Sequence, residues 1–256
     1  MNKLPQITLA FWIMKICATT LGETAGDLLS MTLDVGYAIS SLILISAFFA
    51  TLLTQLASKR YNPLVYWAVI LSTSTAGTTM SDFMDRTLGL GYATGSAILI
   101  GILLCIFALW RVTEGSLSVD RIRSRRGELF YWGAILFSNT LGTALGDFLA
   151  DDSGLGFAGG ALLIGGALAL VVAAHYFTRI STVLLFWLAF VLTRPFGATL
   201  GDVLTKTHEK GGLDFGTVGS SLVLGGVLLV LVVYATWVQR QRAAYAGLTL
   251  VRTPQR

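Results

Sequence analysis

Apolar residues fall into eight long runs along the chain, separated by short connectors that are polar or contain glycine. An α-helix needs about 20 mostly apolar residues to cross the hydrocarbon core of a bilayer. Each run has that length, so the pattern predicts an all-α membrane protein with eight transmembrane helices. The expected spans are 7–30, 35–57, 63–85, 90–112, 128–150, 154–178, 180–204 and 216–239.

Composition supports this prediction. Hydrophobic residues make up 54% of the chain and charged residues only 12%, with a mean hydropathy of +0.73, far from the composition of soluble proteins. A net charge of +4 would favour nucleic-acid binding in a soluble chain, but the basic residues lie in short connectors. We therefore expect the lipid bilayer as a partner, and no nucleic acid.

The basic connectors also predict a topology. Those after even-numbered spans carry Lys59, Arg60, Arg179 and the arginines of an Arg-rich segment at 113–127, and the C-terminal tail adds further arginines. Connectors after odd-numbered spans are mixed or acidic. Because basic loops stay in the cytoplasm, we expect both termini and the 113–127 connector to be cytoplasmic.

Four similar segments end the odd-numbered spans: "TLGETAGDLL", "TAGTTMSDFM", "TLGTALGDFL" and "PFGATLGDVL". In each segment a glycine lies five residues before an aspartate, and a small residue directly precedes that aspartate. The aspartates, Asp27, Asp82, Asp147 and Asp202, are 55, 65 and 55 residues apart. This periodicity indicates an internal repeat. We expect a single transmembrane domain, 1–256, of four helical-hairpin repeats at about 7–57, 63–112, 128–178 and 180–239.

The number of spans per repeat predicts how the repeats are arranged. Each repeat holds two spans, so all four enter the membrane the same way round and are parallel, related by an axis along the membrane normal. The two halves also correspond to each other, since Asp27 and Asp147, like Asp82 and Asp202, are 120 residues apart. The sequence therefore predicts a pseudo-fourfold or twofold axis.

Small residues four apart, such as Gly22 and Gly26, allow membrane helices to approach closely. We expect the odd-numbered helices to pack against their neighbours there. A carboxylate within a membrane helix costs at least ~2.5–3.5 kcal/mol and normally faces a bundle interior. The arrangement predicted is an inner ring of the four odd-numbered helices around a polar cavity, with the apolar even-numbered helices facing lipid.

Residues four apart on a helix share a face, and steps of four from each aspartate define a polar stripe on each odd-numbered helix. Carboxylate and hydroxyl oxygens suit hard divalent ions such as Mn²⁺, Mg²⁺ or Ca²⁺, and clustered carboxylates would let protons compete with the cation. The candidate metal ligands are Glu23, Asp27, Asp82, Asp147 and Asp202. The other residues expected along the substrate path are Lys15, Thr19, Ser74, Thr78, Asn139, Thr143 and Arg194.

The repeats also differ from one another. Glu23 and Lys15 occur only in the first, and Arg194, followed by Pro195, only in the fourth. A proline inside a span should kink it, so the cavity is expected to be asymmetric. Lys15 has no acid within one turn on its own helix, so we expect an acid from another helix as its partner; a purely structural ion pair is the alternative.

Two local resemblances and one global one follow from these motifs. "ALGD" around Asp147 resembles the catalytic Gly-x-Gly-Asp of presenilin-type intramembrane proteases, although its first glycine is absent in all four copies. "ETAGDLLS" is similar to the Glu-x-Gly-Asp signature of a family of Mn²⁺/Ca²⁺ transporters, with the acid displaced by one residue. The whole chain resembles an uncharacterised bacterial family of multi-spanning proteins described only as membrane-anchored. That resemblance implies the inner membrane of a bacterium and no particular activity.

The sequence thus favours a secondary transporter of a small cation, with a divalent metal such as Mn²⁺ as the leading substrate and proton coupling as an option. No Gly-x-x-x-x-Gly-Lys loop is present to bind a nucleotide, so no cofactor and no pump are expected. A non-transporting membrane scaffold or sensor is the main alternative, and an intramembrane aspartyl enzyme the third. The sequence leaves open the identity of the ion, the direction of transport and the oligomeric state.

Overall fold

The computed structural model describes residues 3–251, with side chains described as far as residue 241. Within residues 3–251 the chain forms α-helices joined by short 3₁₀ and π-helical turns, with no β-strand, so the predicted all-helical fold is confirmed. Arg252 and Arg256 of the basic tail lie outside the described residues. The helices are α1 (Leu9–Asp27), α2 (Tyr37–Ala57), α3 (Pro63–Asp82), α4 (Tyr92–Glu114), α5 (Arg125–Asp147), α6 (Gly156–Phe177), α7 (Thr182–Thr205) and α8 (Gly216–Val251).

Five of the described helices are long and apolar enough to cross a membrane: α2, α4, α6, α7 and the Gly216–Gln241 part of α8. This confirms that the chain has several potential membrane spans. The helices α1, α3 and α5 do not reach the same apolarity because they carry the threonines, serines and acids of the polar stripes. Their role as spans stays a prediction.

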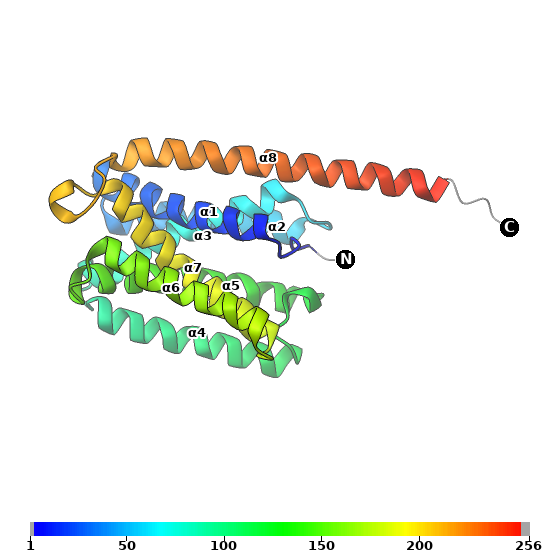
Figure 1. The fold of residues 1–256 in the computed structure, drawn as a ribbon, viewed down its shortest axis with the longest axis horizontal. Coiled ribbons are helices and arrows are strands. Elements are labelled where there is room, and N and C mark those ends of the chain that lie inside the picture. Colours follow the sequence, from blue (N-terminus) through cyan, green and yellow to red (C-terminus); the bar gives the residue numbers. More distant parts are fainter. Residues whose placement is uncertain (1–2, 252–256) are drawn as a thin grey trace.

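The four odd-numbered helices form a closed ring. Helix α1 packs against α3 and α7, and α5 packs against the same two helices from the opposite side. Figure 1 shows these helices running side by side through the middle of the molecule, with α8 along one side and α4 along the other. The expected inner ring is therefore present.

The repeated glycines set the distance between neighbouring ring helices. A Cβ atom added at Gly22, Gly77, Gly142 or Gly197 would lie less than 3.0 Å from an atom of the next ring helix. At Gly77 the obstacle is the backbone of α5, which cannot swing aside. The prediction that the small-residue stripes bring these helices together is confirmed.

The even-numbered helices cover the ring but do not pack mainly within their own repeat. The principal contacts of α2, α4 and α6 are with α3, α5 and α7, and those of α8 are with α1. Packing of each repeat as a self-contained hairpin is therefore not confirmed, because each returning helix packs on the odd-numbered helix of the following repeat. Their outward faces expose large apolar side chains, among them Leu42, Leu53, Leu104, Leu162 and Leu222.

The chain changes conformation directly after the first three repeated aspartates. The helices α1, α3 and α5 each continue into a five-residue π-helical turn, Leu28–Thr32, Phe83–Thr87 and Phe148–Asp152. Glycines with positive φ, such as Gly36 (79°) and Gly91 (72°), then precede the next helix. In the fourth repeat α7 runs on to Thr205 without a π-helical turn. π-Helical turns are frequent at functional sites, and here they place the aspartates at the ends of regular helices.

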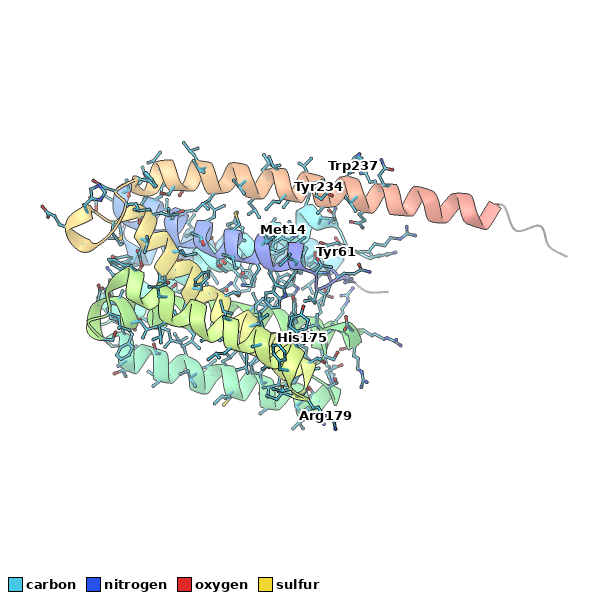
Figure 2. The ribbon with its side chains drawn as sticks, viewed as in Figure 1. Met14, Tyr61, His175, Arg179, Tyr234 and Trp237 are labelled. Atoms are coloured by element: carbon cyan, nitrogen blue, oxygen red, sulfur yellow. The ribbon has the colours of Figure 1, made fainter. Side chains whose placement is uncertain are left out.

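The first described residues and the C-terminal end of α8 lie at the same end of the bundle (Figure 1), which we call the inner end. The ring helices begin there and finish with their aspartates towards the opposite, outer end. Figure 2 labels Tyr234 and Trp237 in the C-terminal half of α8, and more than half of each side chain is exposed. Amphipathic aromatic side chains of this kind are typical of membrane interfaces.

Candidate functional site

The four repeated aspartates all face the interior of the bundle. Each is at most 4% exposed, although each lies at the last residue of a ring helix or close to it. Together with Glu23, one turn further in on α1 and 3% exposed, they form what we call the acid ring. A buried carboxylate requires hydrogen-bonding or charged partners. The structure shows which groups supply them.

Two basic side chains at the outer end bridge the aspartates in pairs. The Nζ atom of Lys206 lies 3.0 Å from Asp27 Oδ2 and 3.1 Å from Asp202 Oδ1. Arg86 lies 2.9 Å from Asp82 Oδ1 through Nε and 3.2 Å from Asp147 Oδ2 through Nη2. Every repeated aspartate is therefore ion-paired, and each basic residue joins two neighbouring repeats.

Lys206 and Arg86 lie in connectors after odd-numbered spans, and neither is among the site residues predicted from the sequence. A signal was present, because each follows the aspartate of its own repeat by four residues and the two are 120 residues apart. Burial alone would lower the pKa of both, but the carboxylates of Asp202 and Asp27 raise the pKa of Lys206 above its usual value. Those of Asp82 and Asp147 do the same for the pKa of Arg86. Both groups remain charged.

Arg194 occupies the centre of the ring, one layer inside the aspartates, and is fully buried. Its Nη2 donates to Glu23 Oε2 at 2.9 Å, to Thr78 Oγ1 at 2.6 Å and to Thr143 Oγ1 at 2.7 Å. The same Glu23 oxygen accepts hydrogen bonds from both threonines. One guanidinium group thus connects side chains from all four ring helices and fills the position where the sequence predicted a polar cavity.

Three carboxylates nevertheless have the spacing of a cation site. Oxygen atoms of Glu23, Asp147 and Asp202 all lie within 4.8 Å of one another, and oxygens on opposite sides of a hard divalent ion are about 4–5 Å apart. Their basic partners use one oxygen of each. The second oxygens accept no hydrogen bond from the described part of the chain. Asp27 and Asp82, the other predicted ligands, are not in this group.

Lys15 has no acidic partner among the described residues. Its side chain is fully buried, and Nζ lies 3.5 Å from Asn139 Oδ1 and 4.2 Å from the centre of the Phe190 ring. The expectation of an acid from another helix is wrong, because the aspartates of the other ring helices lie at the outer end and pair with Arg86 and Lys206. Asn139 presents its oxygen to the lysine while its Nδ2 donates to Thr73 Oγ1 at 2.9 Å.

The remaining predicted path residues join the same buried network. Thr19 Oγ1 donates to the carbonyl oxygen of Thr193 at 3.2 Å, and the carbonyl oxygen of Thr19 accepts from Arg194 Nη1 at 3.4 Å. The carbonyl oxygen of Ser74 accepts from Arg194 Nη2 at 3.4 Å, whereas the Ser74 hydroxyl has no hydrogen-bond partner among the described residues. All the predicted path residues therefore face the ring interior.

Aromatic side chains close the ring near its inner end. An aromatic residue and a tryptophan lie 16 and 15 residues before each repeated aspartate, a pattern that the sequence analysis missed. The aromatic residue that precedes the tryptophan in each repeat contacts the tryptophan of the following repeat. The distances between their ring centroids are 5.5–6.1 Å around the ring of helices. We call this set the aromatic girdle: Phe11 on Trp67, Tyr66 on Trp132, Tyr131 on Trp187 and Phe186 on Trp12.

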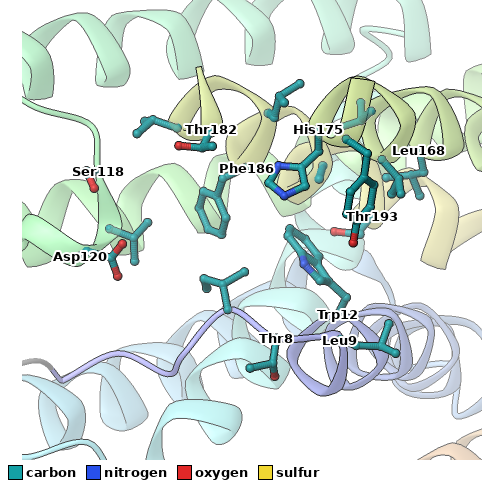
Figure 3. Close-up of a pocket in the computed structure, with 18 of the residues that line it drawn as sticks. Thr8, Leu9, Trp12, Ser118, Asp120, Leu168, His175, Thr182, Phe186 and Thr193 are labelled. Carbon is teal, nitrogen blue, oxygen red and sulfur yellow. The ribbon is translucent and has the colours of Figure 1, made fainter. Parts of the chain in front are cut away.

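A cavity of about 600 Å³ lies outside the ring, between α1, α6, α7 and the 118–120 segment. Figure 3 shows Trp12 and Phe186 on one side of it and His175 of α6 on another. Its lining is mainly apolar and includes no residue of the acid ring. The ionisable chemistry of the ring is therefore separate from this cavity.

The comparisons with known proteins agree with the repeat seen in sequence and structure. No curated protein and no solved structure matches the chain. No family match supports the local similarity to the Mn²⁺/Ca²⁺ transporters. The family described as Repeat of Unknown Function (DUF347) matches four times, at residues 10–61, 65–116, 130–181 and 185–241. These matches cover most of the chain, and the protein belongs to this DUF347 repeat family.

Proposed function

We propose that the protein is a secondary transporter of a small hard cation, with a divalent metal such as Mn²⁺ as the leading substrate. The observation that carries the proposal is the group of three buried carboxylates, Glu23, Asp147 and Asp202, whose oxygens lie within 4.8 Å of one another. They come from three repeats, and each keeps one oxygen without a hydrogen bond from the described chain. Buried acids within a membrane bundle mark ion or substrate pathways.

The proposed arrangement in the membrane follows the ring. All eight helices span the bilayer as four parallel repeats about an axis along the membrane normal, in the inner membrane of a bacterium. Both termini are cytoplasmic, as expected from the basic connectors. The acid ring then lies towards the periplasm and the aromatic girdle towards the cytoplasm, so that substrate reaches the acids from one side and must pass the girdle to leave on the other.

The basic side chains around the acid ring stabilise its buried carboxylates. Five acids of the ring would repel one another if left alone, and Arg194, Arg86 and Lys206 offset that repulsion. A divalent cation entering between Glu23, Asp147 and Asp202 would replace part of this attraction. Exchange of one positive partner for another keeps the cost of the buried charges low.

Uptake into proteoliposomes tests the proposal. The purified protein would be reconstituted, and Mn²⁺, Mg²⁺ or Ca²⁺ entry followed with an ion-sensitive dye in the lumen. We expect Mn²⁺ uptake by the parent and its loss in Asp202→Asn, Asp147→Asn and Glu23→Gln. Asp34→Asn is the matched control, since Asp34 is exposed and has a positive φ of 55°, which asparagine tolerates. A parent that admits none of these ions would refute the proposal.

A non-transporting scaffold or sensor is the second candidate, and a specific observation favours it. Every acid of the ring already has a basic partner, so the network is complete without a bound ion. On this alternative the charges serve only to hold the repeats together. Folded protein that shows no flux of any tested cation would support it.

A further inference from the structure

Lys15 stands in a layer of the ring that is otherwise apolar. The residues twelve positions before the four aspartates are Lys15, Ile70, Ile135 and Phe190, and each is fully buried. The layer lies between the aromatic girdle and the Arg194 layer. A lysine at this position has no role in binding the three carboxylates, from which Arg194 separates it, and it needs another explanation.

We propose that Lys15 is the proton-binding site through which proton movement is coupled to cation movement. The inference rests on the proposed transport function and assigns the coupling ion and its binding residue. An ammonium ion in a buried layer without a counter-ion is costly, yet the Asn139 oxygen at 3.5 Å and the Phe190 ring at 4.2 Å partly stabilise it. Opposed contributions of this kind make both the charged and the neutral amine accessible.

The groups around Lys15 allow such a proton exchange. On α7 the charged neighbour is Arg194, one layer further out, which repels the ammonium ion. The nearest titratable groups on the stripes of α3 and α5 are the phenols of Tyr66 and Tyr131, one layer further in, which hydrogen-bond to each other at 2.7 Å. Up to residue 241, where the described side chains end, the titratable or charged side chains of α8 are Tyr234 and Arg240, near the inner end. No carboxylate among these groups fixes the proton on Lys15.

Arg194 provides the connection between the cation site and Lys15. Its guanidinium group is bound to Glu23 on the outer side, and through Nη1 to the carbonyl oxygen of Thr19, one turn from Lys15. A divalent cation bound at Glu23 weakens the attraction that holds the guanidinium group outwards. The positive charge around Lys15 then increases, and the ammonium ion is destabilised further.

The resulting step is a simple proton transfer. An N–H bond of the Lys15 ammonium breaks, the electron pair stays on Nζ, and the proton passes to water on the side from which the cation has entered. The amine takes up a proton from the opposite side, after the cation has left there and Arg194 has returned to Glu23. Each cation that crosses the membrane is thereby linked to a proton that moves the opposite way.

Two variants of Lys15 with opposite charge behaviour test this assignment. Lys15→Met removes the titrating group, and Lys15→Arg keeps a permanent positive charge that cannot be deprotonated. Proteoliposomes would report Mn²⁺ with one dye and lumenal pH with another. We expect parental protein to move protons against Mn²⁺, and both variants to move Mn²⁺ with the proton movement lost. Lys59→Met, at an exposed connector position, should keep the parental ratio of protons to Mn²⁺.

A purely structural role gives different results. If Lys15 only supplies a charge, Lys15→Arg behaves like the parent. If neither variant folds, Lys15 is structural. Either result overturns the inference. Proton movement at the parental ratio in Lys15→Met overturns it as well. Mn²⁺ uptake by the parent without proton movement would leave the proposed function standing and reject the coupling role alone. Absence of Mn²⁺ uptake in the parent would reject both.

Discussion

The outer and inner parts of the ring are held together by different interactions. At the outer end, five acids and their basic partners form ion pairs that cross between repeats, and the side chains of Lys206 and Arg86 remain 20% and 33% exposed. Near the inner end, eight aromatic rings pack edge to face or tilted around a circle. The outer part is polar and reaches solvent, whereas the inner part is almost entirely apolar.

The two parts also differ in how regularly they repeat. The aromatic contacts and the glycine contacts occur once per repeat, four times around the ring. The bridging bases occur twice, at Arg86 and Lys206, while Glu23, Arg194 and Lys15 each occur once. Positions shared by all four repeats therefore build the ring, and positions that differ between repeats carry its charges. Predictions about stability and charge can separate these two roles.

The largest effect is expected from Arg194→Met. Removing the guanidinium group leaves Glu23 buried without its partner, and breaking a buried pair on one side costs about 3–5 kcal/mol. Unfolding of the detergent-solubilised protein would measure the loss. Addition of Glu23→Gln should restore most of the stability, because no uncompensated charge then remains.

Arg86→Met is the comparison for the outer end. Its side chain is 33% exposed, so water replaces part of the lost interaction and the cost should be smaller than for Arg194. Equal losses of stability in Arg194→Met and Arg86→Met would mean that the exposed outer end and the buried centre depend equally on charge compensation.

Gly77→Ala tests the part of the ring that is common to all repeats. The new Cβ would lie 2.9 Å from backbone atoms of Asn139 and Thr140 on α5, so the helices must separate. Overpacking of this kind costs about 1–3 kcal/mol. Gly133→Ala on α5 is the matched control, since nothing lies within 4 Å of its added Cβ. A similar loss of stability in both variants would show that helix separation is not the cause.

The ring could be predicted from the sequence because its determinants recur. The glycine five residues before each aspartate, and the aspartate itself, appear in every repeat at equivalent positions. A buried carboxylate must face the bundle interior, and small residues must face a neighbouring helix, so the ring of odd-numbered helices follows from physical constraints alone. The packing of α2 on α3 could not be predicted, since apolar helices offer no pattern that distinguishes one neighbour from another.

The charge network was predicted only in part. Glu23 and Arg194 were assigned to the same cavity, but their direct pairing depends on the length of the arginine side chain and on the packing at Gly142, which contacts it. Lys206 lies directly after the end of α7, in the segment that joins α7 to α8. Only the folded loop places its ammonium group over Asp27. Spacing along the chain gives the layer of a residue but not the reach of a flexible side chain.

A smaller effect is expected at the girdle from Tyr131→Phe. The hydroxyls of Tyr131 and Tyr66 form a buried hydrogen bond of 2.7 Å, and its loss leaves one hydroxyl without a partner, at a cost of about 1 kcal/mol. The double variant Tyr66→Phe with Tyr131→Phe should be no less stable than either single variant, because no unpaired hydroxyl remains. Additive losses in unfolding experiments would indicate that the girdle depends on polar contacts as much as the outer end does.

The smallest effect is expected from Lys206→Arg, which keeps the charge at the outer end. Arg86 occupies the equivalent position in the second repeat, so arginine should be accommodated, and the two proteins should unfold alike near neutral pH. Burial lowers the pKa of Lys206, but Asp202 and Asp27 raise it by more, so that the folded value exceeds the usual one. A group with a raised pKa stabilises the fold fully below its unfolded pKa, about 10.4 for lysine, and loses that contribution as the pH rises further.

The parent should therefore lose stability relative to Lys206→Arg only above about pH 10.4, since arginine keeps its proton there. Lys59→Arg, at an exposed position, should show no such divergence from the parent. Unfolding measured at a series of pH values gives the comparison directly. If the parent and Lys206→Arg already diverge near neutral pH, the two carboxylates do not hold the ammonium group charged.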